Sequence, residues 1–569
     1  MKLNVVICAL NSQYIHSSLA PWCLLAGIKV YCKDNISAHI IEGTINEKTE
    51  VVLARITEKN PHVVGFSCYI WNITAIYELI NLVKSLLPNI IIVLGGPEVS
   101  YNAETIFNEN QSVDYIISGE GEKPFALLLN SINERKDVQG LPGLCYRIGN
   151  NVIISKPYNS DQEPPTPYTK EYFETLNGRI SYLETSRGCP YSCAFCLSGR
   201  CGNVRFFDIE KAKNEIILLA NSGTQTVKLV DRTFNANKKR TYEIIEFIIN
   251  NYNTKIPKGV CFHFEIAGDI LDEETINLLS TAPVGAIQLE IGLQSFNPKT
   301  LESVNRKTNI VRLKNNIKQI IKNANMHIHI DLIAGLPYED LRSFEESFNA
   351  AFELKPHMLQ LGFLKLLHGS AMRNDTKRFP CEYTKESPYE VISTPWLSKQ
   401  DFTLLHSTEE ALNRLYNSGR FRRTLEYLLI QCGYSPFRLF TEFGEFVYGK
   451  QSSSLDEYSF LIFDYFSAKK NCDRIKLRDL MVCDRLSTNS TGLLPDFLRV
   501  KDLALSKIKA KLDNDPATRQ QKGVKRGLAL LYSQPYAVYV DYNFKNKNPI
   551  TGEYKLKKLR INEINENFN

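Results

Sequence analysis

Short apolar runs and amphipathic stretches alternate along the first 148 residues. Stretches with helical spacing, such as 73–87, separate five apolar runs with the length of strands: Leu3–Ala9, Ala38–Ile41, His62–Ser67, Ile90–Leu94 and Tyr115–Ile117. Near-continuous apolar strands separated by helices predict a parallel, doubly wound sheet of the Rossmann or flavodoxin-like kind. In such sheets, ligands bind outside the carboxyl ends of the strands. We therefore expect residues 1–148 to form an α/β domain with a binding edge.

The same alternation resumes after a linker, residues 149–178, whose central run EPPTPY contains three prolines. Proline disfavours regular structure, so we expect a spacer there. The next six strand candidates are Ile180–Ser186, Thr226–Val230, Phe262–Ile266, Ala286–Ile291, His327–Ile333 and Met358–Lys365. Polar residues and glycines gather at their carboxyl ends, as in β/α barrels, which build their sites from strand-end loops. Six strands predict a partial (β/α)6 barrel over 179–375.

The pattern changes in the last third of the chain. Segments such as 399–418 and 422–431 have helical periodicity. The stretch after residue 540 is polar and rich in lysine. We expect a mainly helical domain over 376–540 and a loosely held tail over 541–569.

Composition narrows the class of protein. The chain of 569 residues is 43% hydrophobic and 23% charged, as in globular proteins, and its net charge is +6. That charge is small for the length, so nucleic acid is not an expected partner. No apolar run reaches the roughly 18 residues of a membrane span, and most of the 14 cysteines stand singly in apolar segments. A cytoplasmic protein in a reducing setting fits best.

Three cysteines follow the first strand of the predicted barrel. Cys189, Cys193 and Cys196 form a CxxxCxxC array in a loop marked by glycine and proline. Three thiolates at this spacing can each bind one iron of a four-iron cluster and leave the fourth iron open to a substrate or cofactor. A zinc site completed by Cys201 is the alternative, because zinc normally takes four protein ligands in structural sites.

This array, with Phe195 before its last cysteine and a barrel around it, resembles the radical S-adenosylmethionine (SAM) enzymes. The resemblance implies a 4Fe–4S cluster on Cys189, Cys193 and Cys196, with SAM bound to the open iron and cleaved to a 5′-deoxyadenosyl radical. Such an enzyme needs an external electron donor such as flavodoxin or ferredoxin. In this reading Cys201 matches no ligand position and is an ordinary thiol.

Further strand ends match the same family. Asp231 closes the second strand, where the resemblance implies a group near the SAM amino end, and a carboxylate can accept from an ammonium. The alternative for Asp231 is a capping role. The other residues that we expect around SAM are Phe195, Glu265, Glu290, Gln294, Ile333, Gly335 and Leu336.

In the N-terminal domain, Ser67 follows the third strand and Gly95–Gly96 follow the fourth, and glycine lets a bulky ligand approach the backbone. This arrangement resembles a cobalamin-binding fold. We also assign Gly119 and Glu120, from the GEGE motif, to the cobalamin site. The aspartate–histidine motif that supplies an axial ligand to cobalt is missing, and His16 lies too far into its loop to match. Cobalamin would therefore bind base-off and without histidine.

Three segments after the fifth barrel helix, 359–373, 387–398 and 415–421, resemble a subgroup of these proteins with a C-terminal domain of unknown function. We expect a cobalamin-dependent radical SAM methyltransferase that acts on an unactivated carbon or phosphorus centre of a small molecule or peptide. Three alternatives stay open. They are a radical SAM enzyme that forms or rearranges rings, an RNA-modifying methylthiotransferase-like enzyme, and a non-catalytic protein that carries a cluster.

Overall fold

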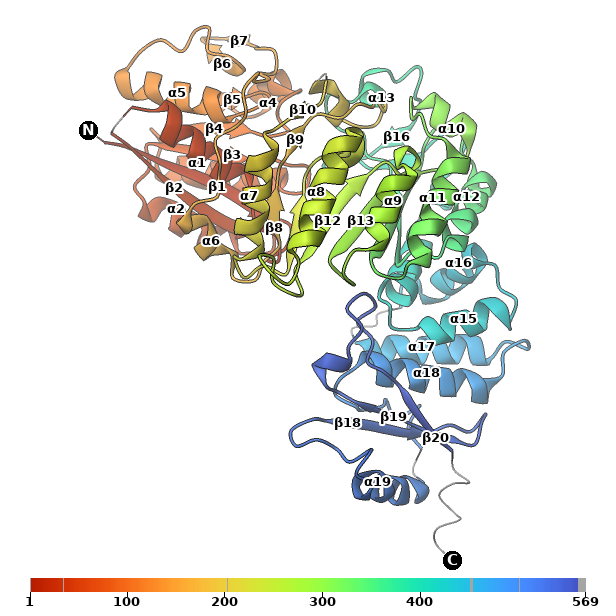
Figure 1. The fold of residues 1–569 in the computed structure, drawn as a ribbon. Helices are drawn as coiled ribbons and strands as arrows, with labels where there is room; N and C mark the ends of the chain where they lie inside the picture. Colours follow the sequence, from red (N-terminus) through yellow and green to blue (C-terminus); the bar gives the residue numbers. More distant parts are fainter. Residues whose placement is uncertain (1, 34, 202, 451–453, 501, 561–569) are drawn as a thin grey trace, which may run out of the picture.

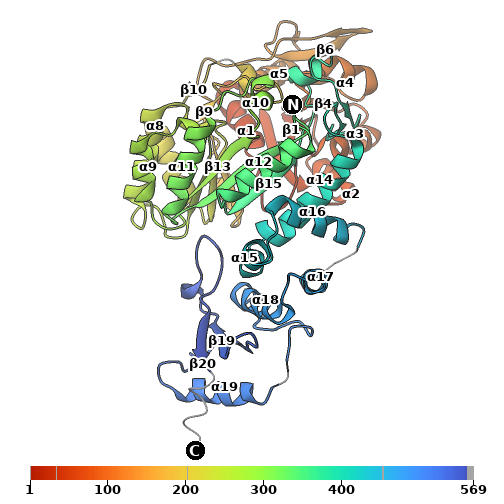
Figure 2. The ribbon, with the colours of Figure 1, turned by 90° about the vertical axis from the view of Figure 1, so that its right-hand side faces the viewer.

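The computed structural model describes residues 2–560 apart from 34, 202, 451–453 and 501, and also omits the side chain of Cys201. It confirms the predicted mixed α/β fold class. An N-terminal α/β domain packs beside a six-stranded barrel, and a mainly helical region extends below the barrel (Figure 1). The turned view shows the last segment as a separate lobe that projects away from the barrel (Figure 2).

A seven-stranded sheet forms the core of the N-terminal domain, in the order β2-β1-β3-β4-β5-β6-β7. The first five strands in that order are parallel, whereas β6 and β7 run antiparallel to their neighbours. The side chains of β1 alternate between two hydrophobic clusters, with Val5 and Ile7 in one and Val6 and Cys8 in the other, so both faces of the sheet are covered by helices. The strands are β1 (Leu3–Asn11), β2 (Ile36–Thr44), β3 (Val63–Ser67), β4 (Ile91–Gly95), β5 (Tyr115–Ile117), β6 (Leu144–Ile148) and β7 (Asn151–Ile153), and the helices are α1 (Ala20–Tyr31), α2 (Thr49–Glu58), α3 (Ile73–Leu86), α4 (Ala103–Glu109) and α5 (Glu122–Glu134).

The barrel has six parallel strands in the order β15-β14-β13-β12-β11-β8, which matches the six predicted strands. The first of these ends early, because β8 covers only Ser181–Leu183 and the next residues form a separate two-stranded ribbon, β9 (Ser186–Arg187) with β10 (Arg205–Phe206). The other strands are β11 (Thr226–Leu229), β12 (Cys261–Ile266), β13 (Ile287–Gln294), β14 (His327–Ala334) and β15 (Met358–Phe363). Helices α7 (Ile209–Ala220), α8 (Lys238–Asn251), α9 (Glu273–Ser280), α10 (Pro298–Ser303), α11 (Ile310–Lys322) and α12 (Leu341–Glu353) connect them on the outside (Figure 1).

Strand β13 shows how the sequence divides the barrel wall. Its residues alternate strictly between fully buried side chains, such as Leu289 and Ile291, and partly exposed ones, such as Glu290 and Gln294. The buried set belongs to the main hydrophobic cluster with the helices, so the partly exposed set faces the barrel interior. The interior wall is therefore polar.

The linker contains the helix α6 (Lys170–Leu176), while the proline run 163–168 has neither helix nor strand. Past the barrel come α13 (Ala371–Asn374), a small ribbon of β16 (Glu382–Tyr383) with β17 (Val391–Ser393), and the helices α14 (Lys399–Ala411), α15 (Arg422–Ile430), α16 (Pro436–Val447), α17 (Leu455–Ser467), α18 (Arg474–Thr488) and α19 (Ala504–Asn514).

A three-stranded antiparallel sheet that the sequence did not predict closes the described chain. It consists of β18 (Arg526–Leu530), β19 (Tyr536–Asp541) and β20 (Lys557–Arg560). The expected tail over 541–569 thus differs from the structure as far as residue 560, because β20 pairs with β19. Residues 561–569 lie outside the described part. No helix of the described residues is long and apolar enough to cross a membrane.

Candidate active site

The three cysteines lie in the loop that joins β9 to β10, at the carboxyl ends of the barrel strands. Gly188, directly before Cys189, has a φ of +99°, a conformation that favours glycine. The loop is held from two sides of the barrel, because the Ala194 amide donates to Val304 O at 2.9 Å and the Met372 amide donates to Ala194 O at 3.0 Å. These two hydrogen bonds therefore fix the backbone of the cysteine loop against the barrel.

Each sulfur has a polar neighbour. Cys193 is buried, which raises the pKa of its thiol, while Arg306 opposes the shift with its Nη1 at 3.8 Å from the sulfur. Cys189 Sγ lies 3.3 Å from Thr233 Oγ1, and the Ser198 amide donates to Cys196 Sγ at 3.4 Å. Sequence reasoning missed Arg306 and Thr233, since neither stands in a motif at a fixed offset from the cysteines.

Four of the predicted SAM residues lie in loops or at strand ends on the carboxyl side of the barrel, and their contact with SAM stays a prediction. Phe195 packs partly buried against the main core, and Ile333 is partly exposed at the carboxyl end of β14. Gly335, in the turn that follows, has a φ of +94°. Gln294 ends β13 with a φ of +75°, which is uncommon for a residue other than glycine. Strained backbone of this kind clusters at functional sites, so Gln294 is a candidate for ligand contact.

Asp231 is fully engaged with the protein. Its carboxylate accepts hydrogen bonds from the Thr185 amide at 3.0 Å, from Thr185 Oγ1 at 2.8 Å and from the Ser186 hydroxyl. Burial raises its pKa to about 6, against these hydrogen bonds. The contacts place Asp231 as a brace between β11 and the start of the cysteine ribbon, and its contact with SAM stays a prediction. Leu336, another predicted SAM residue, is fully buried.

Glu290 and Glu265 lie inside the barrel in a network of charged side chains. Glu290 Oε2 is 2.7 Å from His263 Nε2 and 3.0 Å from Lys228 Nζ, and Glu265 Oε1 is 3.6 Å from the same lysine. Burial alone would raise the pKa of Glu290, yet His263 and Lys228 hold it at about 2.

The network continues onto β14. His329 lies between two carboxylates, with Nδ1 at 3.9 Å from Glu290 and Nε2 at 2.8 Å from Asp331. Burial lowers the pKa of His329, but Asp331 and Glu290 outweigh it and raise the pKa above its ordinary value. Together these side chains give the barrel a hydrogen-bonding wall suited to a polar substrate.

The predicted cobalamin edge of the N-terminal sheet has one open position. A side chain added at Gly95 would meet only Ile117 O, at 3.8 Å, whereas one at Gly96 would come within 2.5 Å of Cys68 O. Gly96 also has a φ of +111°. Position 96 therefore requires glycine because of its backbone conformation and the nearby Cys68 carbonyl, whereas the space beside Gly95 is free. Ser67, at the end of β3, is buried.

Loops from the two domains meet beside the cysteines. The guanidinium of Arg200, just after Cys196, lies 5.7 Å from the centre of the Tyr101 ring in the loop after β4. Tyr389 donates to Glu98 in the same loop at 2.6 Å. His16, by contrast, lies beside the start of β8, with its Nδ1 2.7 Å from the Tyr182 hydroxyl. The loop after β4 and the cysteine loop thus border the same region.

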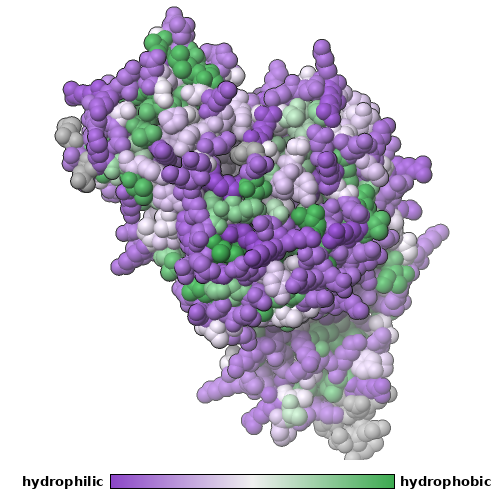
Figure 3. All heavy atoms as spheres, turned by 45° about the horizontal axis from the view of Figure 1, so that its top comes forward, coloured by the Kyte–Doolittle hydropathy of each residue, from purple (hydrophilic) through white to green (hydrophobic). Residues whose placement is uncertain are grey.

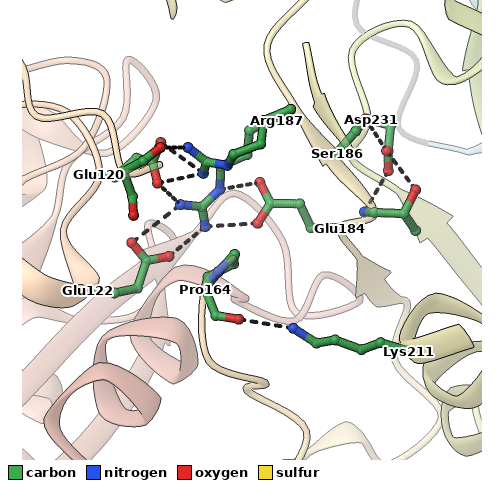
Figure 4. Close-up of polar contacts among 11 residues, drawn as sticks. Glu120, Glu122, Pro164, Glu184, Ser186, Arg187, Lys211 and Asp231 are labelled. Carbon is green, nitrogen blue, oxygen red and sulfur yellow. Dashed lines mark hydrogen bonds and ion pairs between the residues drawn. The ribbon is translucent and has the colours of Figure 1, made fainter. Parts of the chain in front are cut away.

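The GEGE motif forms an ion-pair network between the domains (Figure 4). Arg187 of β9 pairs with Glu120 at 2.6 Å, with Glu122 at 2.5 Å and with Glu184 at 2.8 Å. Arg205 of β10 adds a contact to Glu120 at 2.8 Å. Gly119 packs against the linker, where an added side chain would meet Tyr158 O at 2.3 Å. The roles of Gly119 and Glu120 toward cobalamin stay predictions, because their contacts here are with the linker and the barrel.

On the face shown in Figure 3, the hydrophobic residues among those described lie in small groups between hydrophilic ones. Large exposed apolar patches usually mark membrane or protein interfaces. This face does not have that character.

Three family models match the chain in succession. The B12 binding domain matches residues 21–129, the radical SAM superfamily matches 183–351, and a protein of unknown function (DUF4080) matches 377–528.

Curated relatives are similar over part of their length. The 2-(S-pantetheinyl)-carbapenam-3-carboxylate methyltransferase of Streptantibioticus cattleyicolor is 27% identical over 417 residues, which is 66% of this chain and 60% of that protein. The anaerobic magnesium-protoporphyrin IX monomethyl ester cyclase of Rubrivivax gelatinosus is 25% identical over 339 residues, 56% of this chain and 59% of that protein. The chain thus spans about three-fifths of each relative.

The fold is also that of a solved structure. OxsB, described as a cobalamin-dependent S-adenosylmethionine radical enzyme with aqua-cobalamin bound, superposes with a TM-score of 0.61 at 14% identity, over 91% of this chain and 82% of that one. The chain therefore joins a B12-binding domain, a radical SAM domain and a DUF4080 domain in that order, as its motifs predicted.

Proposed function

We propose that the protein is a cobalamin-dependent radical SAM methyltransferase. The observation that supports this most directly is the arrangement of the two domains. The CxxxCxxC loop at the carboxyl ends of the barrel strands borders the glycine edge of the N-terminal sheet, through Arg200 and Tyr101. A radical source and a methyl carrier would then face the same substrate.

The residues at the cysteine loop fit a 4Fe–4S cluster. Cys189, Cys193 and Cys196 offer three sulfurs in a loop fixed at Ala194, and a fourth protein ligand is not needed if SAM occupies the open iron. We assign Phe195, Gln294, Ile333 and Gly335 to the SAM site. Arg306 stabilises the loop by its contact with Cys193 and by a hydrogen bond to Gly292 O. When bound, the cluster and SAM would supply a 5′-deoxyadenosyl radical, with the electron from an external donor.

The N-terminal edge fits a corrinoid without a histidine ligand. Gly95 leaves space that a larger side chain would fill, and His16 is occupied by its contact with Tyr182. We therefore assign cobalamin to the edge formed by Ser67, Gly95 and Gly96, in the base-off form. All thirteen cysteines with described side chains are free, which suits a reducing cytoplasm.

The barrel interior would bind the substrate. Its wall offers Lys228 and Asp331, which can orient a polar small molecule or peptide by charge-assisted hydrogen bonds. These side chains would hold the reacting atom of the substrate in a fixed place between the two cofactors. The contacts of Glu265 and Glu290 with SAM stay predictions.

Cobalamin binding tests the assignment of a corrinoid to the N-terminal domain. Protein reconstituted with hydroxocobalamin is expected to show a base-off corrinoid spectrum. Gly95→Leu should abolish corrinoid binding while iron content and SAM cleavage are kept. If the wild-type protein binds no corrinoid, the cobalamin assignment is wrong.

Ring formation without methyl transfer is the second candidate, and the similarity to the magnesium-protoporphyrin ester cyclase favours keeping it. SAM labelled with deuterium in its methyl group separates the two. Methyl transfer carries the label into a product, whereas ring formation leaves it in methionine.

A further inference from the structure

The positive charge of the chain is concentrated at its C-terminal end. Residues 502–560 contain 13 lysine and arginine residues against five acidic ones, while the remaining 510 residues contain 55 against 57. These 59 residues form α19 and the sheet β18–β20, which we call the C-terminal lobe. Figure 2 shows the lobe projecting away from the barrel. The excess of basic residues in the whole chain therefore comes from this lobe.

Both faces of the sheet in this lobe are covered. Leu530, Ala537 and Tyr539 pack with Ile508 and Leu512 of α19. On the other face, Val538 and Val540 belong to the main core cluster, together with residues of α18. The basic side chains consequently lie in the loops, at the edge strand and on the outer side of α19.

Two loops bring lysines and an exposed aromatic ring to one end of the sheet. The loop before β18 contains Lys522 and Lys525, and the segment after β19 contains Phe544, Lys545 and Lys547. The loops are adjacent, because the Tyr542 amide donates to Lys525 O at 2.9 Å and Asn543 Nδ2 donates to Gln521 at 3.4 Å. We call these five residues the Phe544 cluster.

The members of the Phe544 cluster are available to a ligand. Phe544 is 82% exposed, and the four lysines are exposed as well. None of the four lysines forms an ion pair with another described residue. An exposed ring flanked by unneutralised lysines has the two features that bind a single strand: a face for base stacking and charges for phosphates.

We propose that the Phe544 cluster binds a single-stranded polynucleotide. A base stacks on Phe544 while Lys545 and Lys547 contact the phosphates on either side of it, and Lys522 and Lys525 contact the strand beyond. The cluster reads charge and a stacked base, so it shows little sequence preference.

Other partners fit these residues less well. A membrane surface needs a helix with a broad apolar face, but the apolar side of α19 is buried against the sheet. Protein interfaces are depleted in lysine, whereas lysine is a common phosphate ligand. A duplex hides its bases from an aromatic side chain on the surface of a loop.

The position of the cluster separates this binding from the chemistry at the cysteines. Pro549, in the loop that follows, packs against Gly285, which precedes β13 at the amino end of the barrel strands. The cysteine loop lies at the opposite, carboxyl end. The inference concerns a binding surface and stands whether or not the proposed function is right.

Fluorescence anisotropy with the full-length protein tests the proposal. The probes are fluorescein-labelled 20-mers of uridine and of thymidine, a 20-base-pair duplex, and vesicles of anionic phospholipid. Each is titrated between 50 and 300 mM salt. We expect both single strands to bind more tightly than the duplex or the vesicles, and the two strands to show whether RNA or DNA is preferred.

Variants assign the binding to the cluster. Reversal of Lys522, Lys525, Lys545 and Lys547 to glutamate should weaken binding at least tenfold and lower the slope of log affinity against log salt by about 3. Phe544→Ala should weaken binding about 5- to 150-fold with little change in that slope. The matched control reverses four exposed lysines elsewhere, Lys29, Lys48, Lys239 and Lys318, and should bind like wild type.

If the fourfold glutamate variant loses its fold by circular dichroism, the glutamine version replaces it, and Phe544→Ala remains a second test. The proposal is overturned if single strands bind no better than the duplex or vesicles. It is also overturned if the cluster variants bind as tightly as the matched control.

Discussion

Replacement of Arg187 by methionine probes the contact that holds the cysteine ribbon to the N-terminal domain. The Arg187 guanidinium is the shared partner of Glu120, Glu122 and Glu184, and it lies two residues before Cys189. Methionine keeps much of the length of the side chain but removes the charge, so three carboxylates lose a common partner.

The expected loss follows from the burial of the group. Burial raises the pKa of Glu122 by itself, yet Arg187 holds the pKa below its ordinary value. Removal of one partner from a buried ion pair costs about 3–5 kcal/mol, because it leaves an uncompensated charge. Arg205 still contacts Glu120, so we expect about 3 kcal/mol, the lower end of that range.

Urea unfolding at neutral pH measures the loss, and hydrogen exchange locates it. Faster exchange is expected in residues 184–206 and 119–124. Adding Glu122→Gln to the methionine variant should recover at least about 1 kcal/mol, since it removes one stranded charge. The exposed pair Arg342–Glu346 provides the control, and Arg342→Gln should change stability by less than about 0.5 kcal/mol.

The pH dependence gives an independent check. A carboxyl whose pKa is lowered in the folded protein stabilises the fold above its ordinary pKa, and this contribution is lost as the pH falls below it. Glu122 is such a group, with an ordinary pKa of 4.5, so wild type should lose this part of its stability below that pH and the Arg187 variant should not. A loss under about 1 kcal/mol at neutral pH would refute the network as an interdomain contact.

Three further predictions concern single sites. Burial raises the pKa of Glu339 from 4.5 to about 7. The folded wild type should therefore lose about 3 kcal/mol of stability in total as the pH rises through that interval. Glu339→Gln should show no such loss when both proteins are unfolded in urea. Arg306→Gln should raise the pKa of the Cys193 thiol and slow its alkylation at pH 8 relative to the exposed control Lys307→Gln; an unchanged rate would contradict the contact at 3.8 Å. Glu290→Gln should lower the pKa of His329, read from the NMR shifts of labelled histidine, and no shift would argue against the network inside the barrel.

The apolar pattern was sufficient to predict the architecture. Buried parallel strands read as continuous apolar runs, and for that reason both sheets appear where the sequence placed them. The C-terminal sheet was missed although β18 (RGLAL) and β19 (YAVYVD) have apolar patterns typical of strands. Its third strand, β20, reads KKLR, a polar segment that gains its place only by pairing with β19.

The site was predictable where spacing is local. Cys189, Cys193 and Cys196 lie in one short loop, so their motif is visible in the sequence. Arg306, in contrast, reaches Cys193 from 113 residues away, and His329 meets Glu290 only through strand register. The lysines after residue 540 were visible in the sequence, but their place beside Lys522 and Lys525 was not, because only the folded sheet brings the two loops together.

Release of 5′-deoxyadenosine by the reconstituted protein tests the central claim most directly. Under anaerobic conditions with a strong reductant, wild type should hold about four irons per chain and convert SAM to 5′-deoxyadenosine. Replacement of Cys189, Cys193 and Cys196 by alanine should abolish both, while Cys201→Ala should match wild type. Full iron content without 5′-deoxyadenosine, or loss of the cluster in the Cys201 variant, would contradict an open-iron site on these three cysteines.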